Sequence, residues 1–293
     1  MKIITDYRNH RSEVPSAVAV GKFDALHLGH RVLLNAIVRE RKNGLSPVVV
    51  TIEPDEQNAV LLTDAEKEAA LSMMGLDTWV RLPFSEVRDL SAEAFVETVL
   101  KDRLQTALVV AGDDFHFGRD RQGDPEFLQE CGEKDGFQVR VIPRVEASGE
   151  VISSKKIRDA VVSGKLDRAN AMLGYPYFMT GRVQHGRRLA GALGFPTMNL
   201  SVNEKKLIPA YGVYFTEVTV DCRKYPGIAH IGVKPTVGGK EPLLEVHLPH
   251  ETGDFYGSEV KVSFLHFHRP EQKFESIDAL KAQVEKDLKA FLQ

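Results

Sequence analysis

The pattern of apolar and polar positions gives the two halves of the chain different rhythms. In the first half, short apolar runs alternate with stretches in which apolar residues recur at the helical period of about 3.6. We expect strands at 17–20, 48–52, 79–82, 108–111 and 139–142, and helices at 32–38, 63–75, 91–104 and 127–132. Strands separated by helices need crossover connections, so the pattern predicts a mainly parallel, Rossmann-like sheet. In such sheets ligands bind outside the carboxyl ends of the strands.

The second half has almost no helical pattern between its apolar runs. After two short helical stretches within 153–174, strand-like runs occupy 213–220, 228–233, 243–248 and 260–267. Turn-forming residues separate these runs, which predicts an antiparallel barrel or sandwich. A final helix begins after Ser276, a good N-cap, and carries one apolar stripe. We therefore predict an α/β chain of two domains, residues 1–175 and residues 176–293, the second closed by a terminal helix.

Composition narrows the class of protein. Of the 293 residues, 43% are hydrophobic and 27% charged, which is typical of a globular protein. The net charge of −3 gives no reason to expect nucleic acid as a partner. The two cysteines, Cys131 and Cys222, are too far apart in sequence to indicate zinc or a disulfide framework. With no apolar run long enough to cross a bilayer, we expect a cytoplasmic protein without a membrane partner. Oligomeric state has no signal in the sequence.

The segment after the first buried strand has the residues of a phosphate site. Gly21 allows a sharp turn off the strand, and Gly29 allows backbone to approach a ligand closely. His27 and His30 flank the expected start of the next helix, where free N–H groups favour a phosphate. Two imidazoles there could stabilise charge on a phosphoryl group during in-line displacement. The alternative is a polar surface loop.

Phe23 and Asp24 precede the two histidines, and the whole arrangement resembles the nucleotidyltransferase superfamily, whose members attack the α-phosphate of a nucleotide. Segments 111–118 (AGDDFHFG) and 152–158 (ISSKKIR) resemble two segments of bacterial FAD synthetases. The resemblance implies that the first domain transfers AMP from ATP to FMN. It implies catalytic roles for His27 and His30 and nucleotide binding by Gly21, Phe23, Asp24, Gly29, Asp114, Ser154 and Arg158.

A second candidate site begins with the loop 186–194, which contains several glycines and arginines. Such a loop can wrap phosphates with its backbone amides, and no Walker A motif is present. Thr197 and Asn199 follow it and alternate along a strand, so both oxygens can face the same side. A hydroxyl and an amide oxygen are hard ligands suited to Mg²⁺. This segment therefore predicts a magnesium–nucleotide site.

Residues 193–199 (LGFPTMN) resemble the riboflavin kinase signature. Further segments match landmarks of that family in order: 211–214, 231–236, 244–247, 253–257 and 269–274. The resemblance implies that Glu245 is the general base; by pattern alone it is a carboxylate on a strand face. It also implies nucleotide binding by Gly186, Arg188 and Gly194 and flavin binding by Arg269, Glu271 and Phe274.

Together the motifs resemble the bacterial bifunctional riboflavin kinase/FMN adenylyltransferase family over nearly the whole chain. The resemblance implies ATP as co-substrate, Mg²⁺ as cofactor, and riboflavin, FMN and FAD as substrates and products. The sequence departs from the family at Ala25, at Glu53–Glu56, at Gly191 and at Met198. These departures leave two alternatives, a kinase-only enzyme and a non-catalytic flavin-binding regulator. The motif of His27 and His30, taken alone, leaves a third, a nucleotidyltransferase with another acceptor.

Overall fold

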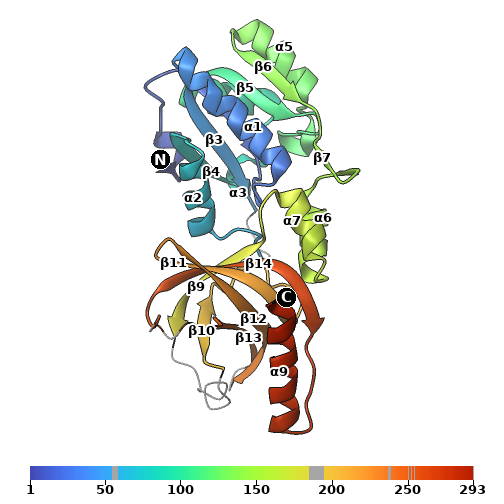
Figure 1. Ribbon diagram of the computed structural model, residues 1–293. Coiled ribbons are helices and arrows are strands. Elements are labelled where there is room, and N and C mark those ends of the chain that lie inside the picture. Colours follow the sequence, from blue (N-terminus) through green and yellow to red (C-terminus); the bar gives the residue numbers. More distant parts are fainter. Residues whose placement is uncertain are drawn as a thin grey trace. The chain divides into compact units, whose positions relative to one another are not determined.

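The structure is a computed structural model that describes residues 1–54, 59–184, 195–236, 239–249, 251, 253 and 255–292. Internal contacts divide the chain into two compact units, Met1–Ile152 and Ser153–Gln293. Each unit has its own sheet system (Figure 1).

The first unit contains a six-stranded sheet of order β1-β4-β3-β2-β5-β6 in which every neighbouring pair is parallel. Its strands are β1 (Lys2–Ile4), β2 (Ser16–Gly21), β3 (Ser46–Glu53), β4 (Thr78–Pro83), β5 (Thr106–Gly112) and β6 (Gln138–Ile142). Its helices are η1 (Tyr7–Asn9), α1 (Leu28–Arg39), η2 (Glu40–Asn43), α2 (Asp64–Met73), α3 (Phe84–Val87), α4 (Ala92–Phe95), the π-helix η3 (Val96–Arg103), η4 (Arg119–Arg121) and α5 (Pro125–Asp135). A small hairpin of β7 (Glu146–Ala147) and β8 (Glu150–Val151) follows. The predicted parallel α/β fold is confirmed.

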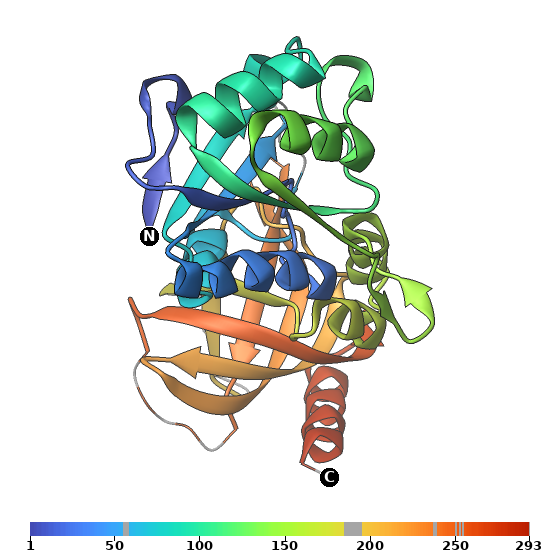
Figure 2. The same cartoon turned by 90° about the horizontal axis from the view of Figure 1, so that it is seen from above.

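The central strands of this sheet are buried on both faces, which explains their continuous apolar runs. On one face, Val18 and Val50 share a hydrophobic cluster with Val99 of η3. On the other face, α1 packs against the sheet with Leu34 and Ile37 fully buried. Helices therefore cover both faces, as Figure 2 also shows.

The strand order reverses at β2. From β2 the chain adds β3 and β4 on one side, and it then crosses back to add β5 and β6 on the other. The segments that leave the carboxyl ends of β2 and β5 therefore start from neighbouring strands. Such a switch point is where open α/β sheets bind ligands, and both nucleotidyltransferase-like motifs begin there.

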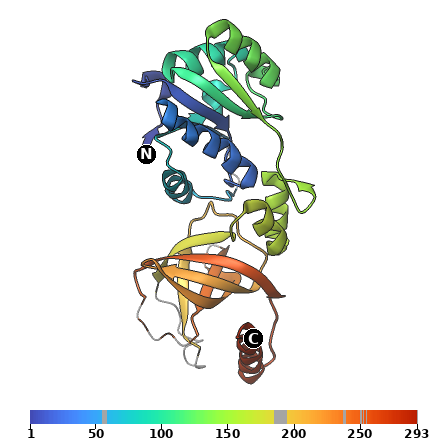
Figure 3. The ribbon, with the colours of Figure 1, turned by 45° about the horizontal axis from the view of Figure 1, so that its top comes forward.

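The second unit is a closed antiparallel barrel of order β10-β13-β12-β11-β14-β9. Its strands are β9 (Phe178–Gln184), β10 (Thr197–Val202), β11 (Gly212–Val220), β12 (Arg223–Thr236), β13 (Gly239–His247) and β14 (Glu259–Pro270), and its helices are α6 (Ser154–Val162), α7 (Leu166–Leu173) and α9 (Ile277–Phe291). Pairing of β9 with both β10 and β14 closes the barrel, and α9 lies beside it (Figure 3). The predicted barrel and terminal helix are confirmed.

Helices α6 and α7 belong to the second unit by contacts, whereas the predicted domain boundary of 175/176 placed them with the first. The side chain of Asn170 on α7 explains this assignment. It donates a hydrogen bond to the backbone oxygen of Phe264 on β14 (3.0 Å) and accepts one from the backbone N–H of Tyr177 (2.7 Å). Helix α7 is thereby attached to the barrel wall and to the start of the first barrel strand.

Candidate active sites

The first candidate site is built around the N-terminus of α1. His27 is the N-cap of this helix, and its Nδ1 accepts a hydrogen bond from the backbone N–H of His30 (3.2 Å). Because Nδ1 is an acceptor, neutral His27 carries its proton on Nε2. The two imidazole rings stack with their centroids 3.6 Å apart, and Phe23 packs edge-on against His30 at 4.9 Å. The His27 ring is thus fixed as an N–H donor beside the helix N-terminus.

Burial keeps both imidazoles neutral near pH 7. Burial lowers the pKa of His27 from 6.5 to about 4, although Asp114 and Asp24 oppose the shift. Burial also lowers the pKa of His30 well below 6.5, and the nearby His27 and Lys67 lower it further. The Nδ1 atom of His30 is buried and has no hydrogen-bond partner among the described residues. A buried nitrogen without a partner next to a helix N-terminus is consistent with a site that a ligand completes.

The sharp turn into this site does not occur at Gly21, the last residue of β2. Phe23 (φ 45°) and Leu26 (φ 46°) adopt the left-handed conformation instead, which is uncommon for such residues. Gly29 lies close to the His27 ring, since a Cβ there would be 3.3 Å from it; its predicted contact with a ligand stays a prediction. Ala25, a departure from the family motif, is fully buried without left-handed backbone.

Asp24 and Asp114 lie in the loops that follow β2 and β5. Asp24 accepts a hydrogen bond from the backbone N–H of Leu61 (3.2 Å), which ties the first motif to the segment before α2. Asp114 is exposed after β5, 3.7 Å from Arg144. Both carboxylates are close enough to His27 to influence its pKa.

A charged cluster lies at the ends of β3 and β4, and the sequence alone does not reveal it. Arg81 makes two hydrogen bonds to Glu53 (2.7 and 2.8 Å) and one to Asp64 (2.7 Å), and it stacks over Trp79. Lys67 is buried beside the same indole. The sequence could have indicated this burial, because Lys67 lies four residues before Leu71 and therefore on the same, buried face of α2. Of the segment 53–56, where the sequence departs from the family, residues 55 and 56 lie outside the described residues.

The second candidate site is a row of side chains on the outer face of the barrel. Asn199 of β10 is directly opposite Glu245 of β13, and Thr197 is directly opposite His247. Directly opposite residues in a sheet share a face, so these four side chains lie together. All four are half-buried, whereas the alternating residues such as Met198 are buried. The geometry therefore brings the two predicted metal ligands and the predicted base onto one face.

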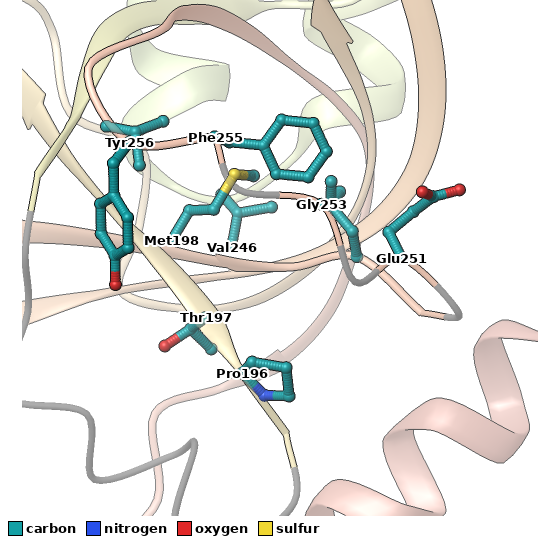
Figure 4. A pocket seen from close by; sticks show the side chains of 10 residues that line it. Pro196, Thr197, Met198, Val246, Glu251, Gly253, Phe255 and Tyr256 are labelled. Atoms are coloured by element: carbon teal, nitrogen blue, oxygen red, sulfur yellow. The ribbon is translucent and has the colours of Figure 1, made fainter.

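His247 and a pocket border this row. Nδ1 of His247 donates to the backbone oxygen of Pro196 (2.8 Å), which fixes the ring beside Thr197. A cavity of about 270 Å³ is lined by Val183, Pro196, Thr197, Met198, Val246, Leu248, Glu251, Gly253, Phe255 and Tyr256. Figure 4 shows Phe255, Met198 and Val246 on its apolar wall, with the hydroxyl of Thr197 nearby.

Arg269 is engaged in the attachment of α9 to the barrel. It hydrogen-bonds both carboxylate oxygens of Asp287 (2.6 to 3.0 Å), which also accepts from Gln283 (2.8 Å). Burial opposes ionisation of Asp287, but the hydrogen bonds from Arg269 and Gln283 keep its pKa below the ordinary value. Glu271 is exposed and Phe274 is half-buried after β14.

The structure does not bear on the roles of several residues singled out by the sequence. Gly186, Arg188, Gly191 and Gly194 lie outside the described residues. Ser154 and Arg158 lie on α6, within the second unit, and Ser153 rather than Ser154 is the N-cap of that helix. Their predicted nucleotide-binding roles stay predictions. Among the described residues, no cluster of three or more His, Cys, Asp or Glu side chains could hold a metal ion, and no helix is long and apolar enough to cross a membrane.

Comparison with protein-family models gives two adjacent matches. Residues 9–156 match the FAD synthetase model, and residues 173–293 match the riboflavin kinase model. The two candidate sites therefore lie in different matched regions.

Two curated relatives align over nearly the whole chain. A bifunctional riboflavin kinase/FMN adenylyltransferase of Pseudomonas fluorescens is 39% identical over 99% of this chain and 96% of its own length. The protein of the same description from Escherichia coli strain K12 is 36% identical over 98% of this chain and 96% of its own length. Among solved structures, a protein of Streptococcus pneumoniae described as a macrolide-efflux protein has a TM-score of 0.90 at 31% identity, covering 99% of this chain and 98% of its own.

Proposed function

Because the chain belongs to the bifunctional riboflavin kinase/FMN adenylyltransferase family, we propose that its barrel phosphorylates riboflavin with ATP and its parallel-sheet unit adenylylates the product. The second reaction converts FMN and ATP to FAD and pyrophosphate. Both matched regions are present on the chain, which favours the bifunctional enzyme over a kinase-only enzyme or a regulator.

The observation that carries the kinase assignment is the register of β10 against β13. It places the carboxylate of Glu245 directly beside Asn199, with Thr197 one step along the same face. Oxygen ligands for a metal–nucleotide complex and a carboxylate base are the groups that phosphoryl transfer to a hydroxyl requires. The barrel supplies them from rigid, hydrogen-bonded strands, which suits a reaction that depends on positioning.

In the kinase reaction, Glu245 acts as general base. It accepts the proton of the terminal hydroxyl of riboflavin as that oxygen forms its bond to the γ-phosphorus of ATP. The bond between the γ-phosphorus and the bridging oxygen breaks, and ADP leaves with the electron pair. FMN and ADP are the products, and the proton stays on Glu245 until solvent removes it.

Thr197 and Asn199 fit a magnesium ion by the chemistry of their donor set. A hydroxyl and an amide oxygen on one strand face are hard, uncharged ligands, which leaves room for phosphate oxygens to complete the coordination. Bound there with ATP, Mg²⁺ would neutralise charge on the phosphates. The apolar pocket beside Thr197 is suited to the nucleoside end of the same ATP molecule, since it offers Phe255 and Met198 to an aromatic base.

In the adenylylation reaction, a phosphate oxygen of FMN attacks the α-phosphorus of ATP and pyrophosphate leaves. His27 donates its Nε2–H to the α-phosphate, and the free N–H groups of α1 stabilise the same charge. His30 fixes the His27 ring by stacking and by its backbone N–H. The remaining predicted nucleotide contacts are Gly21, Phe23, Asp24, Gly29 and Asp114 in this unit, and Ser154 and Arg158 on α6.

Flavin contacts in the barrel unit are assigned to Glu271 and Phe274, with Arg269 acting through its attachment to α9. We place the enzyme in the cytoplasm, where ATP is available and thiols stay reduced. Cys131 and Cys222 are both free.

The test is chromatographic analysis of purified protein in two parallel reactions with ATP and Mg²⁺. One starts from riboflavin and the other from FMN. The proposal expects FMN and then FAD from the first reaction, and FAD with pyrophosphate from the second. FMN without FAD would leave a kinase-only enzyme, and flavin binding without any product would leave a regulator.

A further inference from the structure

His230 on β12 lies between two carboxylates that come from different parts of the barrel unit. Its Nδ1 is 3.9 Å from Oε2 of Glu245 on β13. Its Nε2 is 3.5 Å from Oε1 of Glu271, which follows β14. The two ring nitrogens therefore face two different side chains, one of them the proposed base of the kinase reaction.

Strand register explains how this arrangement arises. Asn199 is opposite Glu245, Glu245 is opposite His230, and His230 is opposite Val213 of β11. These residues form one row across four strands on the same face of the barrel. His230 is therefore separated from the proposed metal ligand Asn199 by the base itself.

Gly232 provides the space in which the imidazole meets the second carboxylate. A Cβ at this position would lie 2.8 Å from Oε1 of Glu271 and 2.8 Å from Cε1 of His230. Real Cβ atoms essentially never make such contacts, so a larger residue would push the two side chains apart. The glycine two positions after His230 is thus part of the same arrangement.

The electrostatic surroundings of His230 are simple in the part of the chain that the structure describes. Its ion-pair neighbours within 4.0 Å are Glu245 from β13 and Glu271 from the segment after β14. The neighbour on β11, Val213, is apolar. The next residue along the row, Arg269 of β14, is already paired with Asp287 of α9. The side chains of His230, Glu245 and Glu271 are 36%, 30% and 47% exposed, so solvent screens these pairs and their contribution to stability is small.

We propose that His230 is a positioning residue for riboflavin phosphorylation, which orients the Glu245 carboxylate while Glu271 holds the imidazole from the other side. The proposal rests on the assignment of Glu245 as base and deepens it. His230 touches no reacting atom: the proton moves from the hydroxyl to Glu245, and the imidazole determines where that carboxylate points. An oriented base supported by a third group is a common device in enzymes.

His230→Ala is expected to lower kcat of the kinase about 10-fold or more, because a small displacement of a catalytic group has large effects on rate. The KM for ATP should stay within about twofold, since the proposal gives His230 no role in nucleotide binding. His230→Gln, which retains an amide at similar reach, should recover part of the lost rate. FAD formation from FMN, measured on the same preparations, should be unchanged.

The decisive experiment is a double-mutant cycle of His230→Ala and Glu245→Gln, with initial rates of FMN formation at saturating substrates. If His230 acts through Glu245, the histidine substitution lowers the rate in the native background and adds nothing in the Glu245→Gln background. An equal loss in both backgrounds, or no loss in the native background, would overturn the proposal. Full turnover by Glu245→Gln alone would instead overturn the assignment of the base, so the two failures are distinguishable.

His266→Ala is a matched control, since this histidine is also exposed on the barrel but its ion-pair neighbour is Asp167. It should leave kcat within about twofold of the native value, as expected for a surface substitution. Melting temperatures of all variants report on folding. If His230→Ala lowers the melting temperature, the double-mutant cycle is repeated with His230→Gln, whose longer side chain preserves the packing. If His230→Gln then has a native-like rate and shows no coupling to Glu245→Gln, the proposal is wrong.

Discussion

The backbone N–H of His30 donates a hydrogen bond to Nδ1 of His27, and the two rings stack above that bond. One residue therefore fixes both the orientation and the tautomer of the other. The consequence is an Nε2–H donor at the start of α1 in a neutral, buried imidazole. This neutral donor can stabilise developing phosphate charge, and the protein avoids the cost of burying a charged imidazolium in its apolar interior.

His30→Ala removes the stacked ring from this pair. We expect FAD formation from FMN to fall about 100-fold or more, the loss typical of a disrupted oxyanion-stabilising donor. FMN formation from riboflavin should stay within about twofold of the native rate, since the kinase groups lie in the other unit. Product analysis by chromatography measures both rates on one sample. Equal loss of both activities in a folded protein would contradict the division of labour between the units.

Asn199→Leu removes the amide oxygen while keeping the size of the side chain. The Mg²⁺ concentration for half-maximal kinase rate should rise about 10-fold or more, because coordination loses one hard ligand. The control is Ser201→Ala, two residues further along the same strand face and exposed. A titration of rate against Mg²⁺ checks the prediction, and identical curves for Asn199→Leu and the native enzyme would remove Asn199 from the metal site.

Acid should destabilise the first unit through His27. Its pKa is about 4 in the folded chain and 6.5 ordinarily, so between these values the unfolded chain binds more protons. The free energy of unfolding therefore falls as the pH drops through 6.5 towards 4, and the contribution of His27 to this dependence disappears about one pH unit above 6.5. From pH 6.5 to pH 5 the loss is about 1.5 kcal/mol, because the slope approaches 1.36 kcal/mol per pH unit only well below pH 6.5.

Trp79 makes this effect measurable in the intact protein. It is the single tryptophan of the chain and is buried in the first unit, so its fluorescence reports unfolding of that unit. Urea titrations at the two pH values should show a smaller difference for His27→Gln than for the native chain. His116→Gln, at an exposed histidine of the same unit, should leave the difference unchanged.

Asp287→Asn should loosen α9. The substitution removes the charge that balances Arg269, whose side chain is only 18% exposed. Removal of one partner of a buried ion pair costs about 3 kcal/mol or more. Calorimetry of the barrel transition and hydrogen exchange of α9 amides measure the effect. The control is Asp89→Asn in the exposed Arg88–Asp89 pair, which should change stability by less than about 0.5 kcal/mol. Equal effects of the two substitutions would show that Asp287 does not anchor the helix.

Local patterns in the sequence predict much of the fold and much less of the site chemistry. The strand expected at 48–52 lies within β3, and the helix expected at 63–75 begins with a capping box in which Thr63 and Glu66 form both hydrogen bonds. These features depend on neighbouring residues, which the sequence displays directly. The short edge strand β1 is not expected, because its pairing with β4 depends on a partner far along the chain.

The same distinction separates the predicted site residues from the others. The alternation of Thr197 and Asn199 is visible in the sequence, and family motifs identify Glu245 and the two histidines. The neighbours of these residues are not visible, because they depend on register between distant strands. His230 beside Glu245 and Asp287 beside Arg269 are examples. The alternation along a strand shows on which face of the sheet a side chain lies. Only the assembled barrel shows which side chains of neighbouring strands lie next to it.

The way the barrel closes has a consequence for the synthesis of the protein. Strand β9 pairs with β14, so the first and last strands of the barrel meet across nearly its whole sequence. The parallel-sheet unit lies entirely within Met1–Ile152, so it can begin to fold on the ribosome as soon as its own residues have emerged. The barrel must wait until translation has passed Pro270, and its unpaired strands then depend on rapid completion or on chaperones. The adenylylating unit of a nascent chain is thus expected to form before the unit that makes its substrate.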